Sequence, residues 1–221
     1  MLEKLKAEVC EQNHELPNNG LVVGSGGNVS GRDPETGLVV IKPSGVKFSK
    51  LTPDTMVVVD TDGTVIDGHM KPSVDTGLHL YIYKHRADVF GITHTHSPYA
   101  SSFAARGERI PAVMTPITHM LGRDVPCSRY ATPGEVDTGQ AVVEAADGGW
   151  AALVKAHGVF TMGRSATQAT SFAMYIEEAA MTTHLAMLRG LVDELPQEEI
   201  DRCYAWFTQN YGQTGSKKVT S

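Results

Sequence analysis

Two histidines, His94 and His96, stand two residues apart in the segment Gly-Ile-Thr-His-Thr-His-Ser at positions 91–97. The residues from Val89 onward are mostly apolar or β-branched, which predicts a buried strand that ends at the pair. Residues two apart in a strand project from one face about 7 Å apart, so both imidazoles can reach one ion. The pair therefore predicts a metal site, with a solvated strand edge as the alternative.

His157 is the candidate for a third ligand, since two imidazoles alone make a weak site. It follows the apolar segment 151–156 and precedes Gly158, whose missing side chain permits close backbone approach. An ion held by three histidines keeps an open coordination position, as catalytic sites do. Such an ion can polarise a carbonyl or activate water for hydrolysis, and the spacing does not separate the two. A histidine that merely ends a strand is the alternative interpretation.

Three short segments could hold an anion beside such an ion. Residues 26–28, Gly-Gly-Asn, offer uncovered backbone donors and an amide, while residues 42–45, Lys-Pro-Ser-Gly, place a cation and a hydroxyl at a strand end. Residues 71–73, Lys-Pro-Ser, lead into a predicted helix whose N-terminal N–H groups favour negative charge. Each segment alone is more often an ordinary turn. Together they fit an enzyme that holds a phosphorylated substrate beside a metal.

The elements that must position these residues are predicted from hydrophobic periodicity and turn signals. Strands and helices intermix without strict alternation, and Asp62-Gly63 signals a hairpin, so the sheet is predicted to be mixed or antiparallel. We expect one α/β domain over residues 1–221, with a central sheet flanked by helices and a polar tail from about Gly212. The predicted strands are one entered from the glycine-rich turn 24–28, then 38–41, 56–59, 65–66, 89–96 and 151–156. The predicted helices begin near Leu2, Val74, Pro98, Thr132, Ala166 and Pro196.

The composition argues against several classes of protein. Hydrophobic residues make up 41% and charged residues 20% of the chain, as in ordinary globular domains. The formal charge of −6, with the two signs interspersed, argues against nucleic-acid and anionic-membrane partners. No apolar run reaches the roughly 18 residues of a membrane span. Three scattered cysteines without a CxxC pair argue against a disulfide framework and a thiolate zinc site, and fit a reduced cytoplasm.

Several segments together resemble the class II aldolase/adducin family over nearly the whole chain. The matching segments are Ser-Gly-Gly-Asn-Val-Ser at 25–30, Ile-Lys-Pro-Ser-Gly-Val at 41–46, Lys-Pro-Ser-Val-Asp-Thr-Gly-Leu-His at 71–79, Thr-His-Thr-His-Ser at 93–97 and Ala-His-Gly at 156–158. Within the family the chain is most similar to the L-ribulose-5-phosphate 4-epimerases. Asp75 stands where fuculose-phosphate aldolases carry glutamate, and Tyr211-Gly212-Gln213 is similar to the terminal tyrosine motif of the epimerases.

The resemblance implies one divalent ion per subunit, Zn²⁺ with Mn²⁺ as the alternative, and a homotetramer with active sites between subunits. It implies that L-ribulose 5-phosphate, a phosphorylated ketose, is epimerised to D-xylulose 5-phosphate by cleavage and re-formation of a carbon–carbon bond. The implied metal ligands are His94, His96 and His157, with Asp75 on or beside the ion. The implied catalytic residues are Asp75, His119 and Tyr211, and the implied phosphate-binding residues are Gly27, Asn28, Ser44, Gly45 and Ser73.

Two departures from the epimerases bear on the substrate. Val74 replaces a serine, although its backbone N–H can still serve. His119 replaces the proton-handling aspartate; a histidine can shuttle a proton near neutral pH, and a loop histidine without that role is the alternative. The competing functions are an aldolase that releases its fragments, as on L-fuculose 1-phosphate, a metal hydrolase, and a non-catalytic adducin-like binding module, whose relatives lack the three histidines.

Overall fold

The computed structural model describes residues 1–211, in which eight strands form one sheet. The strands are β1 (Asn28–Arg32), β2 (Val39–Ile41), β3 (Val57–Val59), β4 (Val65–Asp67), β5 (Gly91–Thr95), β6 (Cys127–Ser128), β7 (Ala151–Val154) and β8 (Gly158–Gly163). Their order in the sheet is β4-β3-β2-β1-β5-β8-β7-β6. All neighbours are antiparallel except β6 and β7, which are parallel, so the predicted mixed sheet is confirmed. β5, which carries His94, lies in the middle.

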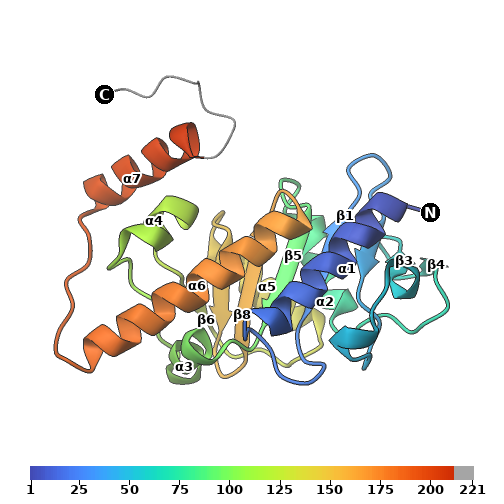
Figure 1. The fold of residues 1–221 in the computed structure, drawn as a ribbon, viewed down its shortest axis with the longest axis horizontal. Helices are drawn as coiled ribbons and strands as arrows, with labels where there is room; N and C mark the ends of the chain where they lie inside the picture. The colour runs from blue at the N-terminus through green and yellow to red at the C-terminus, as the bar shows by residue number, and fades with distance from the viewer. Residues whose placement is uncertain (212–221) are drawn as a thin grey trace.

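Helices cover both faces of this sheet. Among the described residues they are α1 (Glu3–Asn18), α2 (Thr76–His85), α3 (Pro98–Arg106), α4 (Thr115–Leu121), α5 (Val136–Ala146), α6 (Ala166–Met187) and α7 (Gln197–Asn210), with short 3-10 helices at Phe48–Lys50 and Pro53–Thr55. α1 and α6 cross one face, α2 and α5 cover the other, and α3 packs against α6 (Figure 1). α4 and α7 pack on each other at one end of the molecule.

Apolar side chains from both faces of the sheet form the core. On the face covered by α2 and α5, Leu78, Val142 and Phe160 belong to one buried cluster. On the face covered by α1 and α6, Val9 and Val29 belong to another. Each large apolar side chain buried in this way contributes about 1.5–3 kcal/mol to folding. The middle strands are therefore firmly held, and with them the side chains at their ends.

The strand β8 is not among the predicted elements. The predicted strand 151–156 is β7 followed by a tight turn, in which Ala156 has a φ of 58°, and residues 158–163 return as β8. The run Gly-Val-Phe-Thr-Met-Gly is short and apolar, a pattern that periodicity alone does not assign to strand or helix. As a consequence, His157 lies in a hairpin turn between two strands rather than at the end of one.

The helix starts also differ from the sequence analysis. α2 begins at Thr76 rather than at Val74, and α5 begins at Val136 rather than near Thr132. α3 begins at Pro98, as predicted, and Ser97 stands at its N-cap position, but the side chain of Ser97 accepts no cap hydrogen bond there. Local signals thus found the helices other than α4 but placed two of their starts too early.

The structure bears on two of the exclusions made from composition. Within residues 1–211, no helix is long and apolar enough to cross a membrane. Cys10, Cys127 and Cys203 are free, so the described chain has no disulfide framework. The predicted polar tail, with Gly212 and Gln213 of the terminal motif, lies outside the described residues.

Candidate metal centre and substrate cavity

The three predicted histidine ligands meet at one end of the middle strands. Thr95 of β5 pairs with Val159 of β8, which brings the β7–β8 turn beside the end of β5. The ring centroids of His94 and His96 are 4.7 Å apart, and that of His157 lies 4.8 Å and 5.4 Å from them respectively. Their potential ligand nitrogens all lie within 4.8 Å of one another. The fold thus brings together three imidazoles that could hold one divalent ion.

His94 is held from the core side. Its Nδ1 donates to the carbonyl oxygen of Val159 at 3.0 Å, which leaves Nε2 as the nitrogen with a free lone pair. Its ring stacks on Phe160, with the centroids 4.1 Å apart. Burial, followed by the nearby His157 and His96, lowers the pKa of His94 well below its ordinary value. The ring is therefore neutral at physiological pH, which is the form that binds metals.

His157 is placed by the glycine that follows it. A Cβ atom at Gly158 would lie 2.5 Å from the carbonyl oxygen of Thr95 and 2.9 Å from Cδ2 of His96. Because no side chain fits there, the turn reaches the end of β5 only with glycine. Nδ1 of His157 is buried and has no hydrogen-bond partner in the described part of the chain. Buried polar atoms are rarely left unpaired, so this nitrogen fits a bound ion.

His96 and His157 are also kept uncharged. Burial lowers the pKa of both rings, the neighbouring His96 lowers that of His157 further, and the negative charge of Asp75 opposes the shift in both. A metal that binds neutral imidazoles has no protons to displace. The electrostatics of the site therefore favour metal binding at neutral pH.

Asp75 lies at the N-cap position of α2, near these rings. Among the described residues, its carboxylate is not one of the groups that lie within 4.8 Å of one another. Asn28 donates from Nδ2 to Oδ2 of Asp75 at 2.7 Å. Asn28 also pairs with His94 across β1 and β5. This strand pair therefore positions both the His94 ring and the Asn28 amide that orients the carboxylate of Asp75.

A cavity of about 390 Å³ opens over the histidines. Its walls contain every residue that the resemblance assigns to phosphate binding, together with Asp75 and the three histidines. Val74 lines it too, so the position where the epimerases carry serine faces the cavity and lacks a hydroxyl. The lining residues are Ser25, Gly26, Gly27, Asn28, Lys42, Ser44, Gly45, Ser73, Val74, Asp75, His94, His96, Pro133, Gly134 and His157.

Lys42 is a cavity residue absent from the predicted site, although its segment was a candidate anion site. It is only 2% exposed, and its Nζ donates to the carbonyl oxygen of Ser25 at 3.2 Å. Burial lowers the pKa of Lys42, and the negative charge of Asp75 raises it. An ammonium group in the wall is a point charge suited to an anionic substrate. The sequence signal for this role is the cation directly before Pro43-Ser44-Gly45.

His119 and Tyr211 do not line this cavity. His119 lies in α4, a helix that the sequence analysis does not predict, and its ring stacks on Phe207 of α7 with centroids 5.0 Å apart. Phe207 stacks in turn on Tyr211 at 4.2 Å. The three rings share a second cavity of about 260 Å³ with Arg164. Within one chain, the two predicted proton-handling residues lie close together but apart from the histidine site.

His79 is a core histidine that supports the site from behind. It is fully buried, and its Nδ1 lies 2.7 Å from Oγ of Ser30, which also lies 2.8 Å from the hydroxyl of Tyr83. Its ring packs edge-on against Phe160, the ring on which His94 stacks. Burial lowers the pKa of His79 to about 4, opposed by the charge of Asp75. His79 is thus a neutral part of the packing beneath His94.

Comparisons with known proteins identify the family and the fold of the chain. The profile of the family described as Class II Aldolase and Adducin N-terminal domain matches residues 7–184. A solved L-fuculose 1-phosphate aldolase is 31% identical, with a TM-score of 0.88 over 93% of this chain and 96% of its own. YgbL from Klebsiella pneumoniae is 26% identical, with a TM-score of 0.81 over 92% of this chain and 99% of its own. The L-fuculose-1-phosphate aldolase from Thermus thermophilus, at 24% identity, shares the fold with a TM-score of 0.73 over 87% of this chain and 99% of its own.

The chain therefore belongs to the class II aldolase and adducin family. Class II aldolases use a divalent metal, and His94, His96 and His157 could bind one here. The chain thus has the class II aldolase fold, and sugar-phosphate aldolases are among the structures that it resembles.

Proposed function

We propose that this protein breaks and forms a carbon–carbon bond in a phosphorylated ketose with the help of a divalent ion. The observation that carries the proposal is one cavity in which three imidazoles stand with a lining of glycines, serines and a lysine. A metal hydrolase of uncharged substrates would need the imidazoles but not an anion cradle beside them. The similarity to a sugar-phosphate aldolase over nearly the whole chain supports the same chemistry.

The three histidines would hold one ion per chain. When bound, the ion would polarise the ketose carbonyl and stabilise the negative charge that develops as the neighbouring bond breaks. Three imidazoles suit several divalent ions, and we propose Zn²⁺, with Mn²⁺ as the alternative. The buried, unpaired Nδ1 of His157 supports a ligand at this place.

The remaining cavity residues would orient the substrate. Gly27, Asn28, Ser44, Gly45 and Ser73 would bind the phosphate through backbone N–H groups, an amide and hydroxyls, with the ammonium group of the neighbouring lysine supplying positive charge. Asp75, whose carboxylate is oriented by Asn28, would lie on or beside the ion and handle a proton of the substrate. It lines the same cavity as the phosphate-binding residues and the imidazoles.

His119 and Tyr211 would exchange protons with the oxygen of the aldehyde fragment. Since both lie outside the histidine cavity of their own chain, we propose that they act in the site of a neighbouring subunit of a homotetramer. Both rings stack on Phe207, and this common cluster supports a role for both residues in the same site. Holding both fragments between two subunits would keep the second bond-forming step effectively intramolecular.

We propose epimerisation of L-ribulose 5-phosphate to D-xylulose 5-phosphate as the outcome. Asp75 in the cavity wall supports it, since fuculose-phosphate aldolases carry the longer glutamate there. A specific observation favours a second candidate: the chain is 31% identical to an L-fuculose 1-phosphate aldolase. In that case the same bond is cleaved and the aldehyde is released instead of being turned over and re-attached.

One assay separates the two outcomes. Metal-loaded protein is incubated with L-ribulose 5-phosphate and, separately, with L-fuculose 1-phosphate. Formation of D-xylulose 5-phosphate without free aldehyde supports the epimerase, and free aldehyde with dihydroxyacetone phosphate supports the aldolase. His94→Ala protein is the matched control, because it removes a ligand from an otherwise identical chain. If neither substrate nor a panel of other ketose phosphates reacts, the proposal is wrong.

A further inference from the structure

Glu177 of α6 caps the helix that follows the histidine pair. Its Oε1 accepts the backbone N–H of Tyr99 and its Oε2 accepts that of Ala100, both at 2.9 Å. These are the second and third residues of α3, whose free N–H groups are usually taken by the N-cap side chain. Ser97 stands at the N-cap but instead accepts a 3.4 Å hydrogen bond from Thr95. A carboxylate from another helix therefore performs the capping.

This cap holds the helix that begins just after His96. Within residues 1–211 the ring of His96 makes no hydrogen bond, whereas His94 donates to a carbonyl oxygen. The backbone N–H of His96 donates to the carbonyl oxygen of Leu21 at 3.2 Å. On its other side the chain runs directly into α3, which Glu177 holds. The direction of the His96 ring therefore depends on the elbow between β5 and α3.

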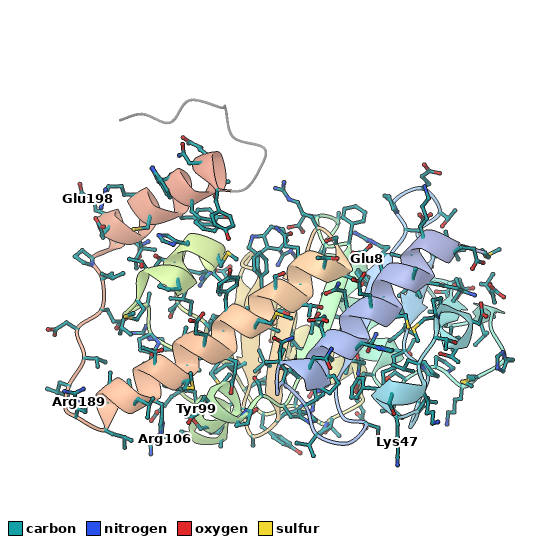
Figure 2. All side chains as sticks on the ribbon, in the orientation of Figure 1. Glu8, Lys47, Tyr99, Arg106, Arg189 and Glu198 are labelled. Carbon is teal, nitrogen blue, oxygen red and sulfur yellow. The ribbon has the colours of Figure 1, made fainter. Side chains whose placement is uncertain are left out.

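α6 is a firm base for the cap. The buried hydroxyls of Thr93 on β5 and Thr170 on α6 lie 3.0 Å apart, and Thr161 on β8 donates to a carbonyl oxygen of α6 at 2.7 Å. Figure 2 labels Tyr99 next to α6, and its ring lies 5.7 Å from that of His184 on the same helix. The helix that carries the capping carboxylate is thus fixed to the two strands that flank the histidine site.

We propose that Glu177 is a positioning residue, which fixes the elbow so that the His96 ring completes the three-histidine site. Hydrogen bonds to a carboxylate are stronger than those to a neutral cap, and the helix dipole favours negative charge at this end. The inference rests on the metal site proposed above and adds a residue that touches neither ion nor substrate. Without the charge of Glu177, the elbow loosens and the His96 ring is less well placed beside the other two imidazoles.

Glu177→Gln tests this inference with little change in shape. The amide keeps one acceptor, loses the charge and turns an N–H₂ group towards a backbone N–H. Glu178→Gln is the matched control, because it removes the same charge from the adjacent, exposed residue. Affinity for Zn²⁺ and Co²⁺ is measured by competition with a chelating dye, and the visible spectrum of bound Co²⁺ reports the coordination geometry. We expect Glu177→Gln to weaken binding about tenfold and to change the spectrum, and Glu178→Gln to behave as wild type.

The outcomes distinguish this inference from the proposed function. If wild-type protein binds no divalent ion, the metal site itself is wrong. If wild type binds but Glu177→Gln binds equally with an unchanged spectrum, or loses only thermal stability, the positioning role is wrong. In a His96→Ala background, Glu177→Gln should cause no further loss of affinity, because its effect passes through His96. If Glu177→Gln does not fold, Glu177→Asp is tested instead, because it keeps the charge but shortens the reach of the carboxylate. We expect a smaller loss of metal affinity with the same spectral change. Wild-type affinity and spectrum in this variant would overturn the inference.

Discussion

The two regions proposed to act in catalysis are built in different ways. The metal centre lies on the middle strands of the sheet, where His94 is 1% exposed and is held by a hydrogen bond and a ring stack. The α4–α7 lobe, made of residues 115–121 and 197–211, lies at one end of the molecule, and Tyr211 is 61% exposed there (Figure 1). The sheet fixes the first region, whereas the second is held by the packing of Ile117, Leu121 and Ile200 against α6 and by the stacked rings.

This contrast follows from what each group has to do. Ligand nitrogens must converge closely on one point, so they need strands whose positions the core determines. A proton-handling side chain needs only to come within hydrogen-bond reach of the reacting oxygen. A peripheral lobe, which we propose is provided by another subunit, can meet that weaker demand. Substitutions in the metal centre should therefore lower the affinity for the metal, whereas substitutions in the lobe should lower turnover alone.

The largest effect is expected from His94→Ala. Removing one of three imidazoles should weaken Zn²⁺ binding by more than about 100-fold, because even residues that only orient ligands contribute about 10–100-fold. Turnover should be lost with the metal. Competition with a chelating dye gives the affinity, and circular dichroism checks that the variant folds. A folded His94→Ala variant with wild-type Zn²⁺ affinity would show that this region is not the metal centre.

His119→Ala should affect turnover and leave metal binding unchanged. A positioned proton donor or acceptor contributes about 10²–10⁴-fold to rate, and we expect a loss in this range with an unaltered Zn²⁺ affinity. Steady-state kinetics and the dye competition measure the two quantities separately. If affinity falls together with rate, the lobe and the metal centre are not independent.

Assemblies of two different variants test whether the lobe of one chain acts in the cavity of another. If the lobe of one chain serves the cavity of another, inactive His94→Ala and His119→Ala proteins should regain activity after they are unfolded and refolded together. Each mixed pair can then combine an intact metal site with an intact lobe. Activity that stays at the level of the separate proteins would place both parts in one chain.

A smaller effect is expected from Gly158→Ala. The added Cβ would meet the carbonyl oxygen of Thr95 at 2.5 Å, and overpacking of this kind lowers the free energy of unfolding by about 1–3 kcal/mol. The metal affinity should fall as well, since the turn carries His157. Gly77→Ala is the control, because its nearest contact is an ordinary 3.8 Å to Val136. Urea unfolding of both variants tests the difference, and equal stabilities would contradict the close approach.

The smallest effect is expected from pH. Three imidazoles with the ordinary pKa of 6.5 would be half protonated at pH 6.5, which would weaken metal binding about eightfold. Burial lowers the pKa of His94, His96 and His157, so protons compete only at more acidic pH. Zn²⁺ affinity should therefore fall by less than about eightfold between pH 8 and 6.5. A steeper loss above pH 6.5 would show that the rings are not held neutral.

The metal centre was more predictable from the sequence than the lobe, and the reason is physical. The spacing of His94 and His96 carries information because strand geometry puts alternate side chains on one face. Gly158 signalled a close approach that the structure contains, although the strand after it was not foreseen. Assigning His157 to the same ion from spacing alone required a guess about which strands pair.

The position of His119 could not be derived in the same way. It lies in a helix of seven residues that is set by packing on α7 rather than by a periodic pattern. Its stack on Phe207 joins residues far apart in the chain, which no local signal reports. The capping of α3 by Glu177 was missed for the same reason, because Ser97 offered a plausible local cap.

Anomalous X-ray diffraction from crystals grown with Zn²⁺ tests directly whether the three histidines hold one ion. We predict one strong peak per chain at the point shared by the three imidazoles, about 2.0–2.1 Å from a nitrogen of each of His94, His96 and His157. An empty site at saturating Zn²⁺, or an ion bound elsewhere with these three rings turned apart, would show that these histidines do not form the metal centre.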